Sequence, residues 1–177
     1  MFEKKKERRR QEEYATKLAA WQQQMDELKG TLAFLDEHDP QEVEGFFTKP
    51  GEEIIAYVTD TGLVELRSRQ GMQVSVIVDK GNLCITTGRI VFQGPGKTIE
   101  CDFAKLSGLH FDEEVGSITV SVSNRQKPLT VGYGLAAQSL IRWRVDLAVA
   151  IHRGGEDAFE KKLRLELDRL NQAKPIL

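Results

Sequence analysis

The chain has 177 residues, of which 40% are hydrophobic and 29% charged, so it is long enough for one domain with a core and additional helices. The formal net charge of −2 argues against a dedicated nucleic-acid-binding protein. Two cysteines make no disulfide framework, which favours a cytoplasmic protein. No stretch approaches the length of a membrane span, which takes about 20 apolar residues. Any membrane contact is therefore expected to be peripheral, at the inner membrane surface.

The first ten residues form a basic arm that is followed by no apolar run. Its basic residues are Lys4, Lys5, Lys6, Arg8, Arg9 and Arg10. Such an arm is compatible with a solvated start to a helix, with contact to an anionic membrane surface, or with non-specific binding of nucleic acid. Because most such runs are solvated, membrane contact is the second alternative and nucleic acid the third.

Residues 3–37 contain no proline, and their apolar residues recur at alternating steps of four and three. This 3.5-residue period is typical of the a and d positions of a coiled coil. The stripe consists of Tyr14, Leu18, Trp21, Met25, Leu28, Leu32 and Leu35. It predicts either self-association or docking on a partner helix, or packing on the chain's own domain. Asp39-Pro40 is expected to end the helix, because the residue before proline disfavours helical geometry.

Residues 40–51 predict a linker, with Phe46 and Phe47 as anchors on the following domain. From residue 52 to residue 133, seven or eight short runs alternate apolar and polar side chains, as is typical of antiparallel strands that are buried on one face. The first two runs are expected to be joined by a turn at Asp60-Thr61-Gly62. A further turn is expected at residues 79–82.

The hydrophobic period becomes helical after Gly134. Residues 135–151 carry a broad apolar face, which predicts a helix packed on the sheet, and Gly154-Gly155 ends it. Residues 156–171 predict a charged amphipathic helix. The expected organisation is a basic arm and long helix at 1–39, a linker at 40–51, a β-rich domain at 52–152 and a C-terminal helix at 153–177.

Several motifs carry a resemblance to a known family. They are Pro50-Gly51-Glu52, the pattern Gly81-x-Leu83-x-Ile85-Thr86-Thr87-x-Arg89-Ile90-Val91-Phe92, the pair Leu106 and Leu109, and Trp143. With this order of elements, residues 46–152 resemble the pleckstrin-homology (PH) superfold, and in particular its GRAM and bacterial PH-like branches. The resemblance implies an α+β, mainly β fold: a seven- to eight-stranded antiparallel barrel capped by a C-terminal helix.

The resemblance also implies a binding module, because such domains bind phosphoinositide headgroups, peptides or proteins, or serve as scaffolds. Headgroup-binding members place several Lys and Arg residues around the loop between their first two strands, where charge-assisted hydrogen bonds reach the phosphates. The expected loop in this chain, residues 59–62, carries an acid and no base. This departure argues against a headgroup site.

Two glycine motifs imitate nucleotide-binding loops. Residues 91–98 end in the Gly-Lys-Thr of a phosphate-binding loop, but Val91 replaces its first glycine and an alternating strand follows where a helix is needed. Residues 132–137 fit the dinucleotide fingerprint, but no βαβ unit follows them. A hairpin turn and a strand-to-helix turn are the better interpretations.

The residue pattern contains no catalytic or metal-binding constellation. The three histidines lack ligand spacing, although His110 and Asp112 could share a strand face, and Cys84 and Cys101 lack the basic neighbours that activate a thiol. We therefore expect a non-enzymatic interaction or scaffold protein without cofactor or metal, which binds a protein partner and self-associates through its N-terminal helix. The alternative is a peripheral membrane adaptor that binds anionic lipid through its basic arm and PH-like domain.

Overall fold

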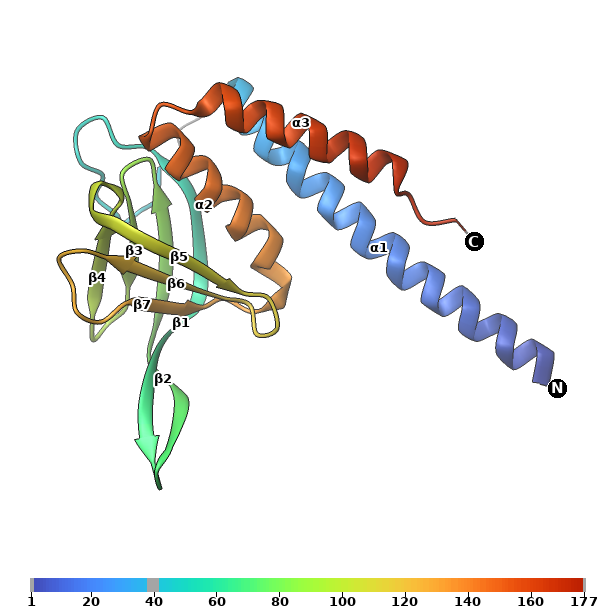
Figure 1. Ribbon diagram of the computed structural model, residues 1–177, viewed down its shortest axis with the longest axis horizontal. Coiled ribbons are helices and arrows are strands. Elements are labelled where there is room, and N and C mark those ends of the chain that lie inside the picture. The colour runs from blue at the N-terminus through green and yellow to red at the C-terminus, as the bar shows by residue number, and fades with distance from the viewer. Residues whose placement is uncertain (1, 38–41, 177) are drawn as a thin grey trace. The chain divides into compact units, whose positions relative to one another are not determined.

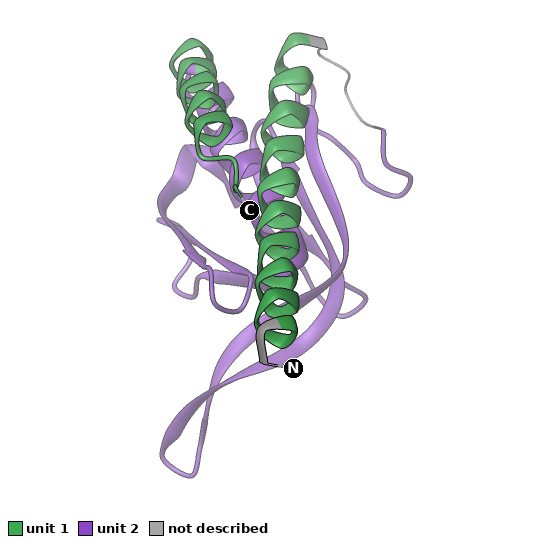
Figure 2. Ribbon diagram, turned by 90° about the vertical axis from the view of Figure 1, so that its right-hand side faces the viewer, with its two compact units in different colours: residues 1–38, 156–177 green, residues 39–155 purple. Residues whose placement is uncertain are grey.

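The computed structural model describes residues 2–37 and 42–176, and the chain divides into two compact units (Figures 1 and 2). One unit contains the helices α1 (Phe2–Glu37) and α3 (Glu156–Gln172). The other contains a seven-stranded sheet and the helix α2 (Gln138–His152). The predicted α+β class is therefore confirmed. None of the described helices is both long and apolar enough to cross a membrane.

All neighbouring strands of the sheet are antiparallel, in the order β4-β3-β2-β1-β7-β6-β5. The strands are β1 (Ile54–Arg69), β2 (Met72–Thr86), β3 (Arg89–Gln93), β4 (Thr98–Asp102), β5 (Leu106–Asp112), β6 (Ser117–Val122) and β7 (Leu129–Gly132). Short 3-10 helices cover Phe103–Lys105 and Leu135–Ala137. In the described part of the chain β4 and β5 are the two edges and do not pair with each other, so hydrogen bonds leave the sheet open there.

The two predicted turns at residues 60–62 and 79–82 are wrong, because β1 and β2 are two long strands that run through them. Their mutual register shifts between Val58 and Thr61, and Asp60 adopts a positive φ of 56°, which marks a bulge inside β1. The turn that joins the strands is Gln70-Gly71. Both residues have positive φ, as a two-residue type I′ hairpin turn requires.

The sheet unit has a main core and a smaller cluster. In the main core, Ile141, Val145 and Ala148 of α2 are fully buried, and α2 contacts β1 and β2, as expected of a capping helix. The smaller cluster joins Ile54, Cys84 and Val91 with partly buried side chains from the preceding segment, among them Phe46. Phe46 is therefore an anchor, as predicted.

Phe47 is not an anchor, because its side chain is 86% exposed. The hydrogen bond that its carbonyl oxygen accepts from Arg89 holds only the backbone of this residue, and this explains why an aromatic side chain can point into solvent here. Both cysteines are free and buried, and burial raises the pKa of Cys84 to about 12. They pack in the strands, as predicted, and are poor nucleophiles.

Helices α1 and α3 contact each other. Met25, Leu28 and Leu32 of the predicted stripe are buried, and Trp21 Nε1 donates a hydrogen bond to the carbonyl oxygen of Leu170 at 2.7 Å. Packing on the chain's own helices therefore accounts for the centre of the stripe. At 36 residues α1 is about 54 Å long, twice the length of the 17-residue α3. Asp39-Pro40, the predicted helix stop, lies outside the described residues.

Candidate partner-binding surface

An open groove lies between the edge strand β5 and helix α2. Strand β5 pairs on one side with β6, and in the described residues no strand covers its other side. The groove has a volume of about 330 Å³. It is lined by Leu106, Ser107, Gly108, Leu109, Asp146, Val149 and Arg153.

The lining of this groove combines apolar side chains with separated charges. Leu106, Leu109 and Val149 supply apolar surface, while Asp146 and Arg153 supply an acid and a base. A free strand edge next to such pockets is the arrangement that accepts an extended peptide as an additional strand: the main chain supplies hydrogen bonds, and the pockets select side chains. The groove thus joins a free strand edge to apolar and charged positions.

Two local features distinguish β5 next to the groove. The ladder between β5 and β6 shifts between Leu106 and Gly108, which leaves Ser107 without a cross-strand partner. A Cβ atom at Gly108 would meet only Ser121 Cβ, at 3.8 Å, so the glycine leaves space beside the strand. Sequence reasoning missed this groove, because β5 and α2 are brought together only by the tertiary fold.

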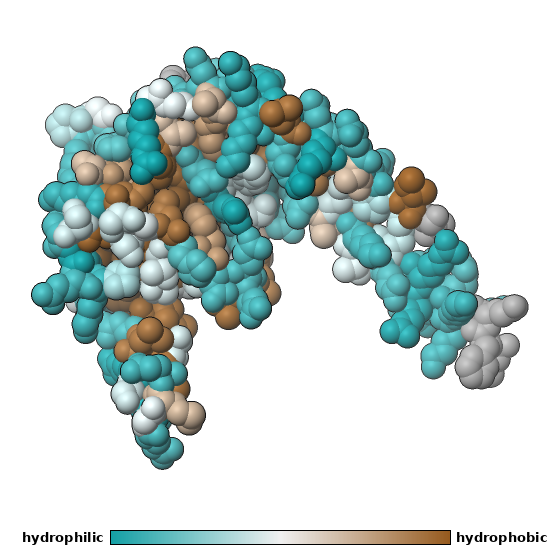
Figure 3. Space-filling view, in the orientation of Figure 1, coloured by the Kyte–Doolittle hydropathy of each residue, from teal (hydrophilic) through white to brown (hydrophobic). Residues whose placement is uncertain are grey.

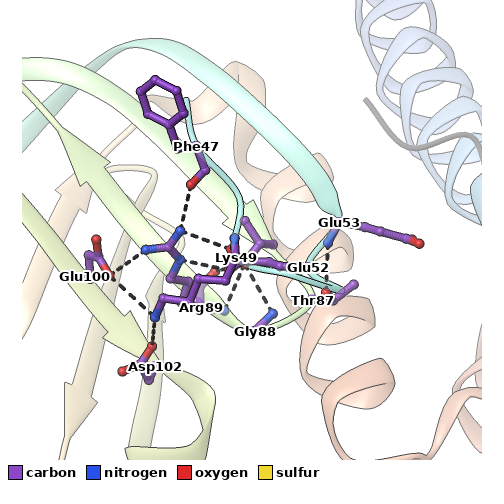
Figure 4. A network of polar contacts seen from close by, with 10 residues as sticks. Phe47, Lys49, Glu52, Glu53, Thr87, Gly88, Arg89, Glu100 and Asp102 are labelled. Atoms are coloured by element: carbon purple, nitrogen blue, oxygen red, sulfur yellow. Dashed lines mark hydrogen bonds and ion pairs between the residues drawn. The ribbon is translucent and has the colours of Figure 1, made fainter. Parts of the chain in front are cut away.

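Three of the residues that carry the family resemblance, Glu52, Thr86 and Arg89, take part in a structural clamp (Figure 4). Arg89 donates from Nε to Glu52 Oε1 at 2.8 Å and from Nη2 to Glu52 Oε2 at 3.0 Å, and the side chains are 6% and 5% exposed. A third contact joins Arg89 Nη1 to Glu100 at 2.6 Å. The guanidinium group is thus held by two carboxylates and the Phe47 carbonyl, and the clamp fixes the segment before β1 onto β3 and β4.

The clamp also determines the charge of Glu52. Burial acts to raise the pKa of this carboxyl group, but hydrogen bonds from Arg89, the Lys49 amide and Thr86 outweigh it, so the pKa lies below its ordinary value of 4.5. The Thr86 hydroxyl group donates to Glu52 Oε1 at 2.6 Å. Arg89 already has its anionic partners within the chain, so the clamp stabilises the fold and is not a free anion site.

The loop that imitates a phosphate-binding loop is occupied by a carboxylate of the chain. Between β3 and β4, the amides of Gly96 and Lys97 donate to Asp79 Oδ2 at 3.0 and 2.9 Å. A Cβ atom at Gly94 would lie 2.6 Å from the same oxygen, so the glycine is needed for this close approach. The interpretation as a hairpin turn is confirmed.

The dinucleotide-like sequence is likewise a structural turn. The amides of Tyr133 and Gly134 both donate to the carbonyl oxygen of Gly116, at 2.9 and 3.0 Å. Gly134 has a φ of 77° and precedes a 3-10 helix, so it lets the chain turn sharply from β7 into α2. These amides are therefore not available to a pyrophosphate group.

His110 and Asp112 both lie in β5, two residues apart, and so share a strand face as predicted. Asp112 accepts hydrogen bonds from the amides of Glu114 and Val115 in a turn, and His152 packs edge-on against Phe103. Among the described residues no group of three potential ligands could hold a metal ion. His38 lies outside them.

The basic arm lies in the first turns of α1, where every basic side chain is exposed. Because consecutive helical residues are 100° apart, residues 4–6 and 8–10 distribute their charge around the helix and form no single face. Glutamates one turn on neutralise Arg8 and Arg9, with nitrogen–oxygen distances of 2.9 and 3.4 Å. Of the stripe that was predicted to self-associate, Tyr14, Leu18, Trp21 and Leu35 are half-buried.

The loop between the first two strands, which would face a lipid headgroup in a PH-like domain, lies elsewhere than the sequence predicted. Residues 59–62 lie inside a strand, and the true β1–β2 turn is flanked by Arg67 and Arg69, which are both exposed. The argument against a headgroup site that rested on the acid at position 60 therefore no longer holds.

Comparison with known proteins gives no family assignment. No family model matches the chain, and no curated protein matches it. Among solved structures it is similar to the C-terminal domain of an unknown protein from Leishmania infantum, with 11% identity and a TM-score of 0.38. That match covers 56% of this chain and 85% of the other.

Proposed function

We propose that this chain is a non-enzymatic interaction protein of the PH-like class. Its sheet unit binds an extended segment of a protein partner in the groove between β5 and α2. The observation that carries the proposal is the free edge of β5 next to a groove with apolar and charged positions. The two nucleotide-like loops give no support to an enzyme, because their amides are bound within the chain.

Selection of peptides on the full chain tests this function. Peptides from a random displayed library are expected to bind, and their addition should shift the amide NMR signals of β5 and of the groove-facing residues of α2. Gly108→Ile should abolish binding by filling the groove. It should leave the fold intact, because the new Cβ atom meets only Ser121 and isoleucine favours strands.

Gly30→Ala is the matched control, since a Cβ atom at position 30 meets nothing within 4 Å and lies in the other unit. It should bind peptides as the wild type does. Peptides that still bind Gly108→Ile, or signal shifts confined to other elements, would refute the groove as the binding site.

We also propose that α1 contributes self-association through the turns that extend beyond α3. Tyr14 and Leu18 are half-exposed there, whereas Leu28 is 1% exposed and belongs to the chain's own packing. Leu18→Glu should therefore lower the mass measured by light scattering without unfolding the helix pair. An unchanged oligomeric mass would remove α1 from the self-association surface.

The alternative function is a peripheral membrane adaptor, which the exposed basic arm and the arginines beside the β1–β2 turn favour. Each Lys or Arg near an anionic leaflet contributes about 1 kcal/mol, and the contribution falls with salt. Co-sedimentation with phosphatidylserine vesicles should occur at low salt and be lost on deletion of residues 1–10. Binding that survives both the deletion and high salt would contradict an electrostatic arm.

A further inference from the structure

The hairpin of β1 and β2 extends beyond the rest of the sheet as a two-stranded arm (Figure 1). Strand β7 pairs with β1 only at residues 62–64, and β3 pairs with β2 only at residues 82–85. Beyond these limits, residues 65–69 of β1 and residues 72–76 of β2 pair only with each other in the described structure. We call residues 65–78 the hairpin arm.

The hairpin arm exposes apolar side chains that its own chain does not cover. Leu66, Met72 and Ile77 are 71%, 65% and 58% exposed. Figure 3 shows apolar surface where the arm leaves the sheet. Leu66 and Ile77 share one face of the hairpin, and Met72 lies on the other face next to the turn. A two-stranded ribbon is marginal in water by itself, and exposed apolar surface on it often marks an interaction site. The arm is therefore expected to gain stability from a further strand.

The two edges of the arm differ in charge. The free part of β1 carries Glu65, Arg67 and Arg69, and charges of this kind protect a strand edge from pairing. The free part of β2, residues 72–78, reads Met-Gln-Val-Ser-Val-Ile-Val, without charge or proline. An uncharged, β-branched edge of this length is a template for strand addition. The unprotected edge is that of β2.

The turn geometry tells which amides of β2 point outward. In a hairpin with a two-residue turn, the residues that flank the turn form a hydrogen-bonded pair, and bonded and non-bonded pairs then alternate. Arg69 and Met72 are the flanking pair. The backbone groups of Gln73, Ser75 and Ile77 therefore point to the free edge, with Ser75 at the centre.

We propose that the free edge of β2 pairs antiparallel with the same edge of a second copy of the chain, about a two-fold axis at Ser75. This register sets Ser75 opposite Ser75, Val74 opposite Val76, and Gln73 opposite Ile77. Valine pairs meet on one face of the joined sheet, and every cross-strand pair is uncharged.

The occupant is a second copy because the sequence of this edge is self-complementary under two-fold symmetry. On the β1 edge the outward residues of the arm are Leu66 and Ser68. An axis at Ser68 would set Arg67 opposite Arg69, and an axis at Leu66 would need Val64, which already pairs with Thr130 of β7. The surface that pairs two β2 edges includes neither the β5 groove nor the α1 residues proposed to self-associate. It is therefore a third surface, independent of the proposed function.

Proline at the two serines of the arm tests this pairing in the full chain. Ser75→Pro removes an outward amide from the β2 edge and leaves the hydrogen bonds within the hairpin in place, because proline is tolerated where the N–H faces solvent. Ser68→Pro is the matched control, since Ser68 has the same outward orientation on the β1 edge. The comparison is made in the Leu18→Glu background, which removes association through α1. In sedimentation velocity, Leu18→Glu alone and Leu18→Glu with Ser68→Pro should show twice the mass of one chain, and Leu18→Glu with Ser75→Pro the mass of one chain.

Hydrogen exchange provides a second, independent measurement. The amides of Gln73, Ser75 and Ile77 should be protected in the wild type at high protein concentration and lose this protection on dilution. Ser75→Lys, which keeps the amide but sets a charge opposite itself, should also give one chain if Ser75→Pro fails to fold by circular dichroism. In the Leu18→Glu background, a monomer without any further substitution, a dimer in both Ser75 variants, or loss of the dimer in Ser68→Pro would each overturn the proposal.

Discussion

At the scale of single residues, a buried ion pair between Arg89 and Glu52 is central to the polar contacts around the start of β1. Its partners are almost fully removed from water and are joined by two hydrogen bonds. Such a pair contributes little compared with an apolar replacement, but removal of one partner leaves the other charge buried without compensation. The pair is therefore a sensitive point of the fold, although it is not a binding site.

Replacement of Glu52 by glutamine should destabilise the chain by about 1.5–3 kcal/mol, because Arg89 keeps its charge in a buried position and retains only Glu100 as a carboxylate partner. Urea unfolding followed by tryptophan fluorescence and circular dichroism measures the change. Glu12→Gln is the control, since the Arg8–Glu12 pair lies on the exposed surface of α1. It should leave the unfolding midpoint nearly unchanged. Equal effects of the two substitutions would contradict the central position of the clamp.

The same pair should make stability depend on pH. The pKa of Glu52 is lower in the folded chain than its ordinary value of 4.5, so the unfolded chain binds more protons as the solution becomes acidic. The contribution of Glu52 is complete above about pH 4.5 and is lost as the pH falls through the folded pKa. The stability difference between wild type and Glu52→Gln should therefore shrink with acidification below that value. A constant difference would show that the carboxyl group is not held ionised by Arg89.

At the scale of elements, α1 combines a packed half with an unsupported half. Its central residues Met25, Leu28 and Leu32 are buried, whereas residues 4–13 are exposed. Basic side chains in the first turns also oppose the helix dipole, which favours negative charge at this end. The first turns thus depend on their intrinsic helix propensity and on glutamate pairs at i+4, which contribute only a few tenths of a kcal/mol each.

Hydrogen exchange should therefore divide α1 into two parts. Amides of residues 5–9 should exchange close to their intrinsic rates, because the side chains of these turns are exposed and local opening exposes no packed surface. Amides of residues 25–32 should exchange only through opening of the helix pair, and therefore much more slowly. Anionic vesicles would slow exchange of the first group under the membrane-adaptor alternative. Uniform protection along α1 without vesicles would show that another surface covers the N-terminal turns.

At the scale of the whole molecule, the sequence predicts elements better than it predicts how they meet. The short strands β4, β6 and β7 lie where alternation predicts them, because each alternates a buried and an exposed face. Asp60 and Gly62 misled the prediction, since residues typical of turns also form bulges inside long strands. The sequence does not predict that the Asp79 carboxylate binds the amides of Gly96 and Lys97. These residues lie 17 or more positions apart and are brought together only by the fold.

The sheet unit should fold without the two outer helices. All seven strands, helix α2 and the clamp lie within residues 42–155, so a fragment of this length keeps its full strand order and its main core. A core of this size is sufficient for a domain of about 110 residues. The fragment should give a dispersed amide NMR spectrum and unfold in one cooperative transition, with the strong amide protection of β1, β2 and β6 retained.

The fragment also separates the surfaces that are proposed to bind. It should keep peptide binding in the β5 groove and dimer formation through β2, and lose any association that requires α1. A fragment with a collapsed, poorly dispersed spectrum would mean that α1 and α3 complete the core of the sheet unit, and the two units would then have to be treated as one folding unit.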